Sequence, residues 1–352
     1  MSLADRRAAR TLELVDFASE SREEAALAAH VLDVLRDGGV DARDAGDTCV
    51  LAGVTARGHR PLVVLAGHLD TVPAQGNRPG RRDAEAVHGL GAADMKGAVA
   101  VMVELARARP GASVDVGYVF FGREELPVTE GALSGLLTRE PSLRSADLVV
   151  MMEPTANALH AGCLGNVNAR WTFHGRAGHS ARPWLADNAI HRAAEGIHAL
   201  AELEPQPHDF DGLRFVEVVS VTRVAGGIAG NVIPAEAVAH VNYRYAPGRT
   251  PAGAEAWLRA LCEPYGTVEI EGNAPSAPVA TANPLAQRLI ATGGLAVEAK
   301  QAWTPVAEFA AAGVDAVNFG PGDPAQAHTR DEHVRIDALA RSYDTLEAFA
   351  CA

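Results

Sequence analysis

Short apolar runs that end in acidic or histidine side chains recur along this chain, and they constrain its fold more than any other feature. The runs 62–66, 114–121 and 148–152 are too short for typical helices and predict buried β-strands. Helices are expected between them, so the strands would be parallel and their carboxyl ends would meet at one edge of a sheet. The sequence therefore predicts an α/β fold whose crevice collects functional side chains.

The segment Gly67-His68-Leu69-Asp70 ends the first of these strands. Side chains two residues apart share one face of a strand, so His68 and Asp70 can point the same way. A metal-binding histidine commonly gives its other ring N–H to a carboxylate, which fixes the orientation of the ring. The pair suits a metal ligand and its orienting partner. A strand-end histidine in an ordinary turn is the alternative when the pair is taken alone.

Further candidate metal ligands follow the other strands or lie in adjoining turns. Two histidines and three carboxylates, without a thiolate, suit a pair of zinc or manganese ions bridged by one carboxylate, with the ions roughly 3.5–4 Å apart. Glu124 precedes one of these carboxylates and projects differently, so it can act as general base for the attacking water. The five candidate ligands are His68, Asp94, Glu125, Glu153 and His328.

Each of these signals also has a simpler interpretation. The Glu124-Glu125 pair could be a solvated surface pair, and Asp94 could be the N-terminal cap of the helix expected over residues 98–108. Gly89-x-Gly91 suggests a nucleotide-binding loop, but Asp94 stands where the third glycine belongs and would repel a phosphate. The occurrence of these groups at successive strand ends favours the metal site.

Two local patterns describe the surroundings of the strands. Ser21 and Glu24 form a capping-box pattern in front of a helix expected over residues 25–35. Residues 74–87 are rich in Gly, Arg and Asp and predict a surface loop.

The length and the strand pattern predict two domains. A chain of 352 residues exceeds what one compact core usually contains. Near Gly165 the pattern changes to alternating strands in the order β-α-β-β-α-β, a ferredoxin-like unit of about a hundred residues. We expect a catalytic domain formed by residues 1–165 and 275–352, with helices around a mostly parallel sheet, and an inserted α+β domain over residues 166–274.

Charge and cysteine usage exclude several classes of partner. The formal net charge of −13 argues against nucleic acid and against an anionic membrane surface. The four cysteines are scattered and predict reduced thiols rather than disulfides or zinc sites. No signal peptide opens the sequence, and no apolar run approaches the about 20 residues that a membrane span needs. These features predict a cytoplasmic protein without membrane or nucleic-acid partners.

Five motifs together resemble the M20 metallopeptidase and deacylase family, and within it the bacterial succinyl-diaminopimelate desuccinylases. The resemblance covers nearly the whole chain and is highly specific. The motifs are Gly67-His68-Leu69-Asp70-Thr71-Val72-Pro73, Gly89-Leu90-Gly91-Ala92-Ala93-Asp94-Met95-Lys96-Gly97, Arg123-Glu124-Glu125, Glu153-Pro154-Thr155 and Ala327-His328-Thr329-Arg330-Asp331-Glu332.

The resemblance implies a dizinc exopeptidase-like catalytic domain with two Zn²⁺ per chain, for which Co²⁺ or Mn²⁺ could substitute. It also implies a role for each candidate at the strand ends. One ion would be held by His68, Asp94 and Glu153 and the other by Asp94, Glu125 and His328, with Asp70 beside the ligands and Glu124 as the base.

The inserted domain also matches the family. Gly178-His179-Ser180-Ala181-Arg182-Pro183 resembles its lid motif, in which His179 would reach the active site of a partner subunit and polarise the scissile carbonyl. A loop histidine on a basic surface is the alternative. Asn231 and Arg244 resemble residues that bind the substrate carboxylate, and an arginine fork suits such an anion. Arg182 and Thr304 complete the expected substrate-binding set, and a homodimer through the inserted domain follows from the same resemblance.

The implied reaction is hydrolysis of N-succinyl-LL-2,6-diaminopimelate to succinate and LL-diaminopimelate, a step of lysine biosynthesis. The alternatives are another M20 reaction on a small N-acyl amino acid or peptide, namely acetylornithine or acetyl-lysine deacetylation, or dipeptidase or carboxypeptidase activity. From other classes, a nucleotide-dependent oxidoreductase and a non-catalytic metal-binding scaffold remain. The chain departs from the family at Thr304-Pro305 and Glu308, where Ser/Thr-Asp and an Arg are usual, and at 126–129 after the base.

Overall fold

The computed structural model describes residues 3–109 and 113–352 and divides into two compact units. The first unit comprises Met1–Gly162, Val279–Glu298 and Thr304–Ala352. The second unit comprises Cys163–Pro278 and Ala299–Trp303. Within the described residues, no helix combines the length and the apolar character that crossing a membrane requires.

An eight-stranded sheet forms the centre of the first unit, in the order β1-β2-β6-β3-β7-β17-β8-β16. The inner pairs β6–β3, β3–β7 and β7–β17 are parallel, whereas β1–β2, β2–β6 and β17–β8 are antiparallel. The expected mostly parallel centre is therefore present. The strands are β1 (Ala42–Gly46), β2 (Cys49–Gly53), β3 (Leu62–His68), β6 (Asp115–Phe121), β7 (Leu148–Met151), β8 (Leu159–Ala161), β16 (Val297–Ala299) and β17 (Ala316–Asn318).

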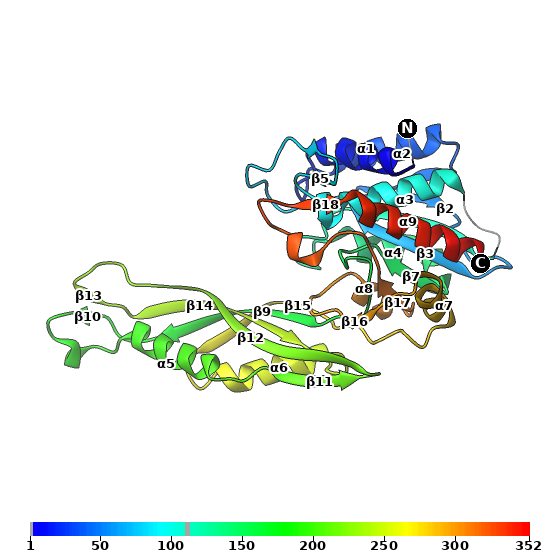
Figure 1. Cartoon of the computed structure of the whole chain (residues 1–352). Coiled ribbons are helices and arrows are strands. Elements are labelled where there is room, and N and C mark those ends of the chain that lie inside the picture. The colour runs from blue at the N-terminus through cyan, green and yellow to red at the C-terminus, as the bar shows by residue number, and fades with distance from the viewer. Residues whose placement is uncertain (1–2, 110–112) are drawn as a thin grey trace. The chain divides into compact units, whose positions relative to one another are not determined.

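Helices cover this sheet, and α3 is the most deeply buried of them. It contacts α1, α2 and α9 on one side and β3 and β6 on the other, which explains why its sequence is apolar nearly all round (Figure 1). The helices of the unit are α1 (Leu3–Asp16), α2 (Ala25–Asp37), α3 (Gly97–Ala108), α4 (Ala132–Arg139), α7 (Pro284–Gly293), α8 (Val306–Ala311) and α9 (Ile336–Cys351).

Two local predictions in this unit are wrong. Residues 74–87 are not entirely loop, because β4 (Arg81–Arg82) and β5 (Ala86–His88) form a small sheet with β18 (His333–Arg335). β5 pairs with β4 and with β18, and β18 lies far along the chain and leaves no local signal. The capping box is also absent: Glu24 is the residue that precedes α2, and its side chain caps nothing.

The second unit contains a five-stranded antiparallel sheet in the order β11-β12-β14-β9-β15. Its β-α-β-β-α-β succession is the one expected, with β11 as an extra edge strand. Trp171, Phe173, Tyr243 and Leu258 lie in the core between this sheet and α5 and α6. The elements are β9 (Gly165–His174), α5 (Ala189–Ala201), β11 (Gln206–Phe210), β12 (Leu213–Gly226), β14 (Glu236–Tyr245), α6 (Pro251–Cys262) and β15 (Thr267–Ala274).

Candidate metal centre

The candidate ligands of the first unit gather because parallel strands end at one edge of its sheet. β3 pairs with β6 so that His68 lies opposite Phe121, and it pairs with β7 so that Ala66 lies opposite Met151. His68 is the last residue of β3, Glu124 and Glu125 lie in the turn after β6, and Glu153 follows β7. Residues far apart in the sequence are thereby neighbours at the carboxyl edge.

Asp94 reaches this edge from a tight turn rather than from a helix cap. It lies in the irregular segment Ala92–Lys96, whereas α3 begins at Gly97 after Lys96. The interpretation of Asp94 as the cap of that helix is therefore wrong. Gly91 opens the turn with a φ of 78°, and a Cβ atom there would lie 2.7 Å from Thr71 Cγ2. The glycine is thus required by close packing and a left-handed backbone.

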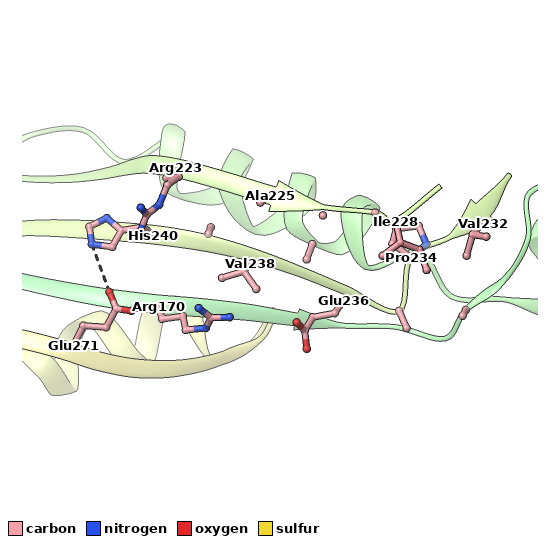
Figure 2. Close-up of a pocket in the computed structure, with 16 residues that line it drawn as sticks. Arg170, Arg223, Ala225, Ile228, Val232, Pro234, Glu236, Val238, His240 and Glu271 are labelled. Carbon is pink, nitrogen blue, oxygen red and sulfur yellow. Dashed lines mark ion pairs between the residues drawn. The ribbon is translucent and has the colours of Figure 1, made fainter. Parts of the chain in front are cut away.

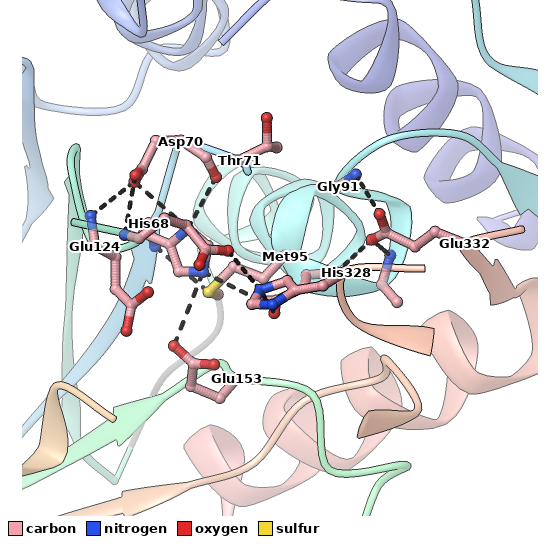
Figure 3. A network of polar contacts seen from close by, with 12 residues as sticks. His68, Asp70, Thr71, Gly91, Met95, Glu124, Glu153, His328 and Glu332 are labelled. Carbon is pink, nitrogen blue, oxygen red and sulfur yellow. Dashed lines mark hydrogen bonds and ion pairs between the residues drawn. The ribbon is translucent and has the colours of Figure 1, made fainter. Parts of the chain in front are cut away.

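The two carboxylate oxygens of Asp94 face two different histidines. Its Oδ1 lies 3.1 Å from His68 Nε2, and its Oδ2 lies 3.6 Å from His328 Nε2. His68 Nε2 is also 3.9 Å from Glu153 Oε1, and His328 Nε2 is 3.0 Å from Glu125 Oε1 (Figure 3). Asp94 is therefore shared by two groups of possible ligands.

Within each of these two groups, one ligand atom from every residue lies within 4.8 Å of the others. The groups are His68, Asp94 and Glu153, and Asp94, Glu125 and His328. A third combination, His68 with Glu124 and Glu125, meets the same criterion. The first two match the ligand sets implied by the family resemblance, while the third places Glu124 beside His68 and Glu125.

The charges of the cluster fit a bound divalent cation. Burial, and then the negative charge of Glu153, raise the pKa of Glu124 well above its usual value. Burial disfavours a charged His68, yet its contacts with Asp70 and Asp94 raise its pKa well above the usual value. The hydrogen bond with Glu125 raises the pKa of His328 to about 9. Such a concentration of carboxylates calls for a cation, and its N and O donors suit zinc or manganese.

Asp70 connects His68 with the turn that carries the expected base. His68 Nδ1 lies 3.0 Å from the backbone oxygen of Asp70 and 3.6 Å from its Oδ1. The Asp70 carboxylate accepts hydrogen bonds from the amides of Glu124 (2.9 Å) and Glu125 (3.1 Å). Ser21 Oγ donates a further hydrogen bond of 2.7 Å to it. Asp70 thus orients both a ligand and the Glu124-Glu125 turn.

Sequence reasoning missed two contributors to this network. Ser21 was assigned to a helix cap, and nothing local indicates that its hydroxyl binds Asp70. Glu332 lies four residues after His328, and its carboxylate accepts backbone hydrogen bonds from the Asp94 turn. The sequence signal that could have identified Glu332 is its place in the same motif as His328.

His179 and Asn231 lie close together in the second unit. β10 (Gly178–His179) pairs with β13 (Val232–Ile233), and the amide of Ser180 donates a hydrogen bond of 3.0 Å to the backbone oxygen of Asn231. The side chain of His179 is exposed, and its Nδ1 accepts a hydrogen bond of 3.0 Å from the amide of Ala181. Arg182 in the same loop is exposed as well.

Arg244 and Thr304 occupy other places. Arg244 is half-buried on β14, and its Nε donates a hydrogen bond of 2.9 Å to Asn242. His240 lies on the same face of that strand and helps to line a pocket of about 570 Å³ with Arg170, Arg223 and Glu271 (Figure 2). Thr304 is buried in the first unit, just before α8. The metal-ligand candidates thus belong to one unit, and Arg182, Asn231 and Arg244 to the other.

The chain is similar to known hydrolases over nearly all of its length. It is 39% identical over 342 residues to a candidate succinyl-diaminopimelate desuccinylase of Mycobacterium tuberculosis, with 96% of each chain covered. It is 34% identical to the succinyl-diaminopimelate desuccinylase of Corynebacterium glutamicum, with 94% of this chain and 92% of the relative covered.

Two solved structures with a similar fold are described as peptidases. Aminopeptidase PepT of Bacillus cereus aligns with a TM-score of 0.79 at 17% identity, covering 99% of this chain and 98% of that chain. The YXEP protein of Bacillus subtilis, described as a dinuclear metal-binding peptidase, aligns with a TM-score of 0.68 at 17% identity, covering 99% and 97%. Residues 64–352 match peptidase family M20/M25/M40. With this match, the chain belongs to the M20 family of metal-dependent hydrolases and is an amidohydrolase of that family.

Proposed function

We propose that this protein hydrolyses N-succinyl-LL-2,6-diaminopimelate to succinate and LL-diaminopimelate, within lysine biosynthesis. The hydrolytic chemistry is supported above all by the shared position of Asp94 between His68 and His328. The choice of substrate is supported by the two desuccinylase-like relatives, which align along nearly the whole chain.

We further propose that the centre holds two Zn²⁺ ions, with Co²⁺ or Mn²⁺ as substitutes. His68, Asp94 and Glu153 would bind one ion, and Asp94, Glu125 and His328 the other. When bound, such ions polarise the substrate carbonyl and lower the pKa of the attacking water. The nitrogen and oxygen donors, with a carboxylate able to bridge, are the support for this composition.

Glu124 is the proposed general base. Its carboxylate accepts a proton from water as the water oxygen attacks the amide carbon, and it returns that proton to the leaving nitrogen as the C–N bond breaks. The products are a carboxylate and a free amine. The backbone amide of Glu124 donates a hydrogen bond to Asp70, which keeps the Glu124 carboxylate next to the proposed ligands. Glu124 belongs to neither of the two proposed ligand sets.

Residues of the second unit are proposed to recognise the substrate. His179 would donate a hydrogen bond to the developing oxyanion in the active site of a partner subunit, since a positioned donor of this kind lowers the barrier by a few kcal/mol. Asn231, Arg182 and Arg244 would bind substrate carboxylates, with Thr304 contributing from the first unit. The cationic and amide donors of these side chains match a dianionic acyl substrate.

A homodimer through the second unit is part of the same proposal. Several large apolar side chains in this unit are exposed, including Trp184 at 74% and Ile228 at 90%. Exposed apolar groups gathered in one unit are typical of an interaction surface. The second unit would then serve both as a dimerisation domain and as a lid.

A substrate panel tests the reaction. The zinc-loaded protein is assayed with N-succinyl-LL-diaminopimelate, N-acetylornithine, N-acetyl-lysine and a dipeptide, with release of the free amine as the readout. We expect the highest kcat/KM for the succinyl substrate. A preference for an acetyl substrate or for the dipeptide would retain the amidohydrolase and reject the desuccinylase.

A further inference from the structure

The side chain of Glu332 makes an unusual set of contacts close to the candidate metal centre. It is only 2% exposed, and its carboxylate accepts hydrogen bonds from three backbone amides of one turn. Oε2 accepts from Gly91 (2.8 Å), and Oε1 accepts from Ala93 (2.9 Å) and Asp94 (3.0 Å) (Figure 3). The backbone oxygen of Glu332 also accepts a hydrogen bond of 3.0 Å from the amide of Gly89.

These contacts join two segments that carry ligands. Glu332 follows His328 by four residues and leads into β18, which pairs with β5 immediately before the Gly89–Asp94 turn. The other side of the His328 loop is held by Gln75, whose Nε2 donates a hydrogen bond of 3.0 Å to the His328 backbone oxygen. One carboxylate therefore ties the Asp94 turn to the segment that presents His328.

We infer that Glu332 is a positioning residue that holds Asp94 in its bridging orientation before any metal binds. The inference rests on one part of the proposed function, the binding of metal by this centre, and does not depend on the substrate. The backbone of Asp94 and Met95 departs from helical angles, and the amides of Gly91, Ala93 and Asp94 donate to the Glu332 side chain. The Glu332 carboxylate supplies acceptors to these three amides, so the direction of the Asp94 side chain depends on it.

The substitution Glu332→Gln is nearly isosteric, but it removes the match between a carboxylate with two acceptor oxygens and three backbone N–H donors. A glutamine presents one oxygen and one NH₂ group, so the NH₂ group must face at least one of the three backbone N–H groups. A buried donor is then left without an acceptor, and the turn is expected to shift. Asp331→Asn is the matched control. Asp331 is the neighbouring residue and its side chain is exposed, so the substitution removes the same charge without affecting a buried contact.

Metal binding provides the readout. Each protein is freed of metal with a chelator and titrated with Co²⁺, and the affinity and the visible absorption spectrum are recorded. We expect Glu332→Gln to bind about 10–100-fold more weakly, as is typical when a group that orients a ligand is lost, and to show an altered spectrum at saturation. Asp331→Asn should match the wild type. Wild-type affinity and spectrum in a folded Glu332→Gln protein would overturn the inference.

A second measurement uses the wild-type protein and applies even if the variant does not fold or the wild type binds no metal. Hydrogen exchange is followed by NMR on the metal-free protein. We expect the amides of Gly91, Ala93 and Asp94 to be protected, because their acceptor is present without metal. Rapid exchange of all three would show that Glu332 does not preform the turn. Absence of Co²⁺ binding by the wild type would instead refute the proposed function.

Discussion

The candidate metal centre and the candidate substrate residues of the second unit differ in how firmly their side chains are held. His68 and Asp70 are 1% and 0% exposed, and Asp70 receives hydrogen bonds from two other segments. His179, Arg182 and Asn231 are exposed in their loop. We infer that the buried candidate ligands are held in place by the fold, whereas the exposed candidate recognition residues would become fully fixed only with a substrate or a partner subunit.

The largest expected effect tests the buried side of this comparison. Asp94→Ala should abolish both metal binding and activity, because one carboxylate contributes to both ligand groups. Elemental analysis after dialysis measures the metal, and Glu153→Ala is the comparison, since Glu153 belongs to one of the two proposed ligand sets only. Two tightly held ions in the Asp94→Ala protein would contradict the shared ligand.

Glu124→Gln separates the base from the ligands around it. The amide cannot accept a proton from water, so kcat should fall by about 10²–10⁴-fold while the metal content stays at the wild-type value. Steady-state kinetics and elemental analysis on the same preparation measure the two quantities. Near-normal turnover would remove Glu124 from the mechanism, and loss of metal would make it a ligand instead.

His179→Ala tests the exposed side of the comparison. Loss of an oxyanion donor should lower kcat by about 10²–10³-fold with metal content unchanged. If His179 acts in the site of a partner, mixing this variant with Glu124→Gln should restore activity, because one site of each heterodimer then carries neither defect. Native mass spectrometry verifies subunit exchange. Exchange without recovery would place His179 in its own chain or outside the site.

A smaller effect concerns Glu308, which stands in the first unit where the family usually has an arginine. Burial raises its pKa to about 7, and Ser134 Oγ donates a hydrogen bond of 2.6 Å to it. The folded state therefore binds this proton more tightly than the unfolded state, whose carboxyl has a pKa near 4.5. Stability from this group is complete below pH 4.5 and is lost as the pH rises through 7.

Glu308→Gln removes this dependence. The variant should gain up to roughly 3 kcal/mol over the wild type between pH 4 and pH 8, from the free-energy equivalent of the pKa shift. Urea unfolding at both pH values measures the difference, and Glu23→Gln, at an exposed glutamate of the same unit, is the control. A pH-independent difference between Glu308→Gln and the wild type would show that the carboxyl titrates normally in the folded protein.

Much of the fold follows from local pattern, and the shortest strands were missed for a physical reason. The expected strands at residues 62–66, 114–121 and 148–152 correspond to β3, β6 and β7, because each is a continuous apolar run. The short strands β4, β5 and β8 were missed, since two or three residues carry no periodicity. In addition, β5 and β8 pair with strands that are distant in the sequence.

The sequence by itself determined which chemical groups stand at the strand ends. His68, Glu125 and Glu153 lie within a few residues of the ends of apolar runs, and that placement depends only on neighbouring residues. Asp94 and His328 were candidates from adjoining turns, and the structure brings all five into two overlapping groups. The types of the candidate ligands could thus be predicted before any tertiary contact was known.

Only the tertiary structure decided how these groups are held. The hydrogen bond from Ser21 to Asp70 spans 49 residues, and that from Gly91 to Glu332 spans 241. A hydroxyl or carboxylate that hydrogen-bonds to a residue distant in the sequence resembles, in its own neighbourhood, an ordinary cap or surface residue. Its role is created when the chain folds, because a hydrogen bond depends on separation in space and not along the sequence.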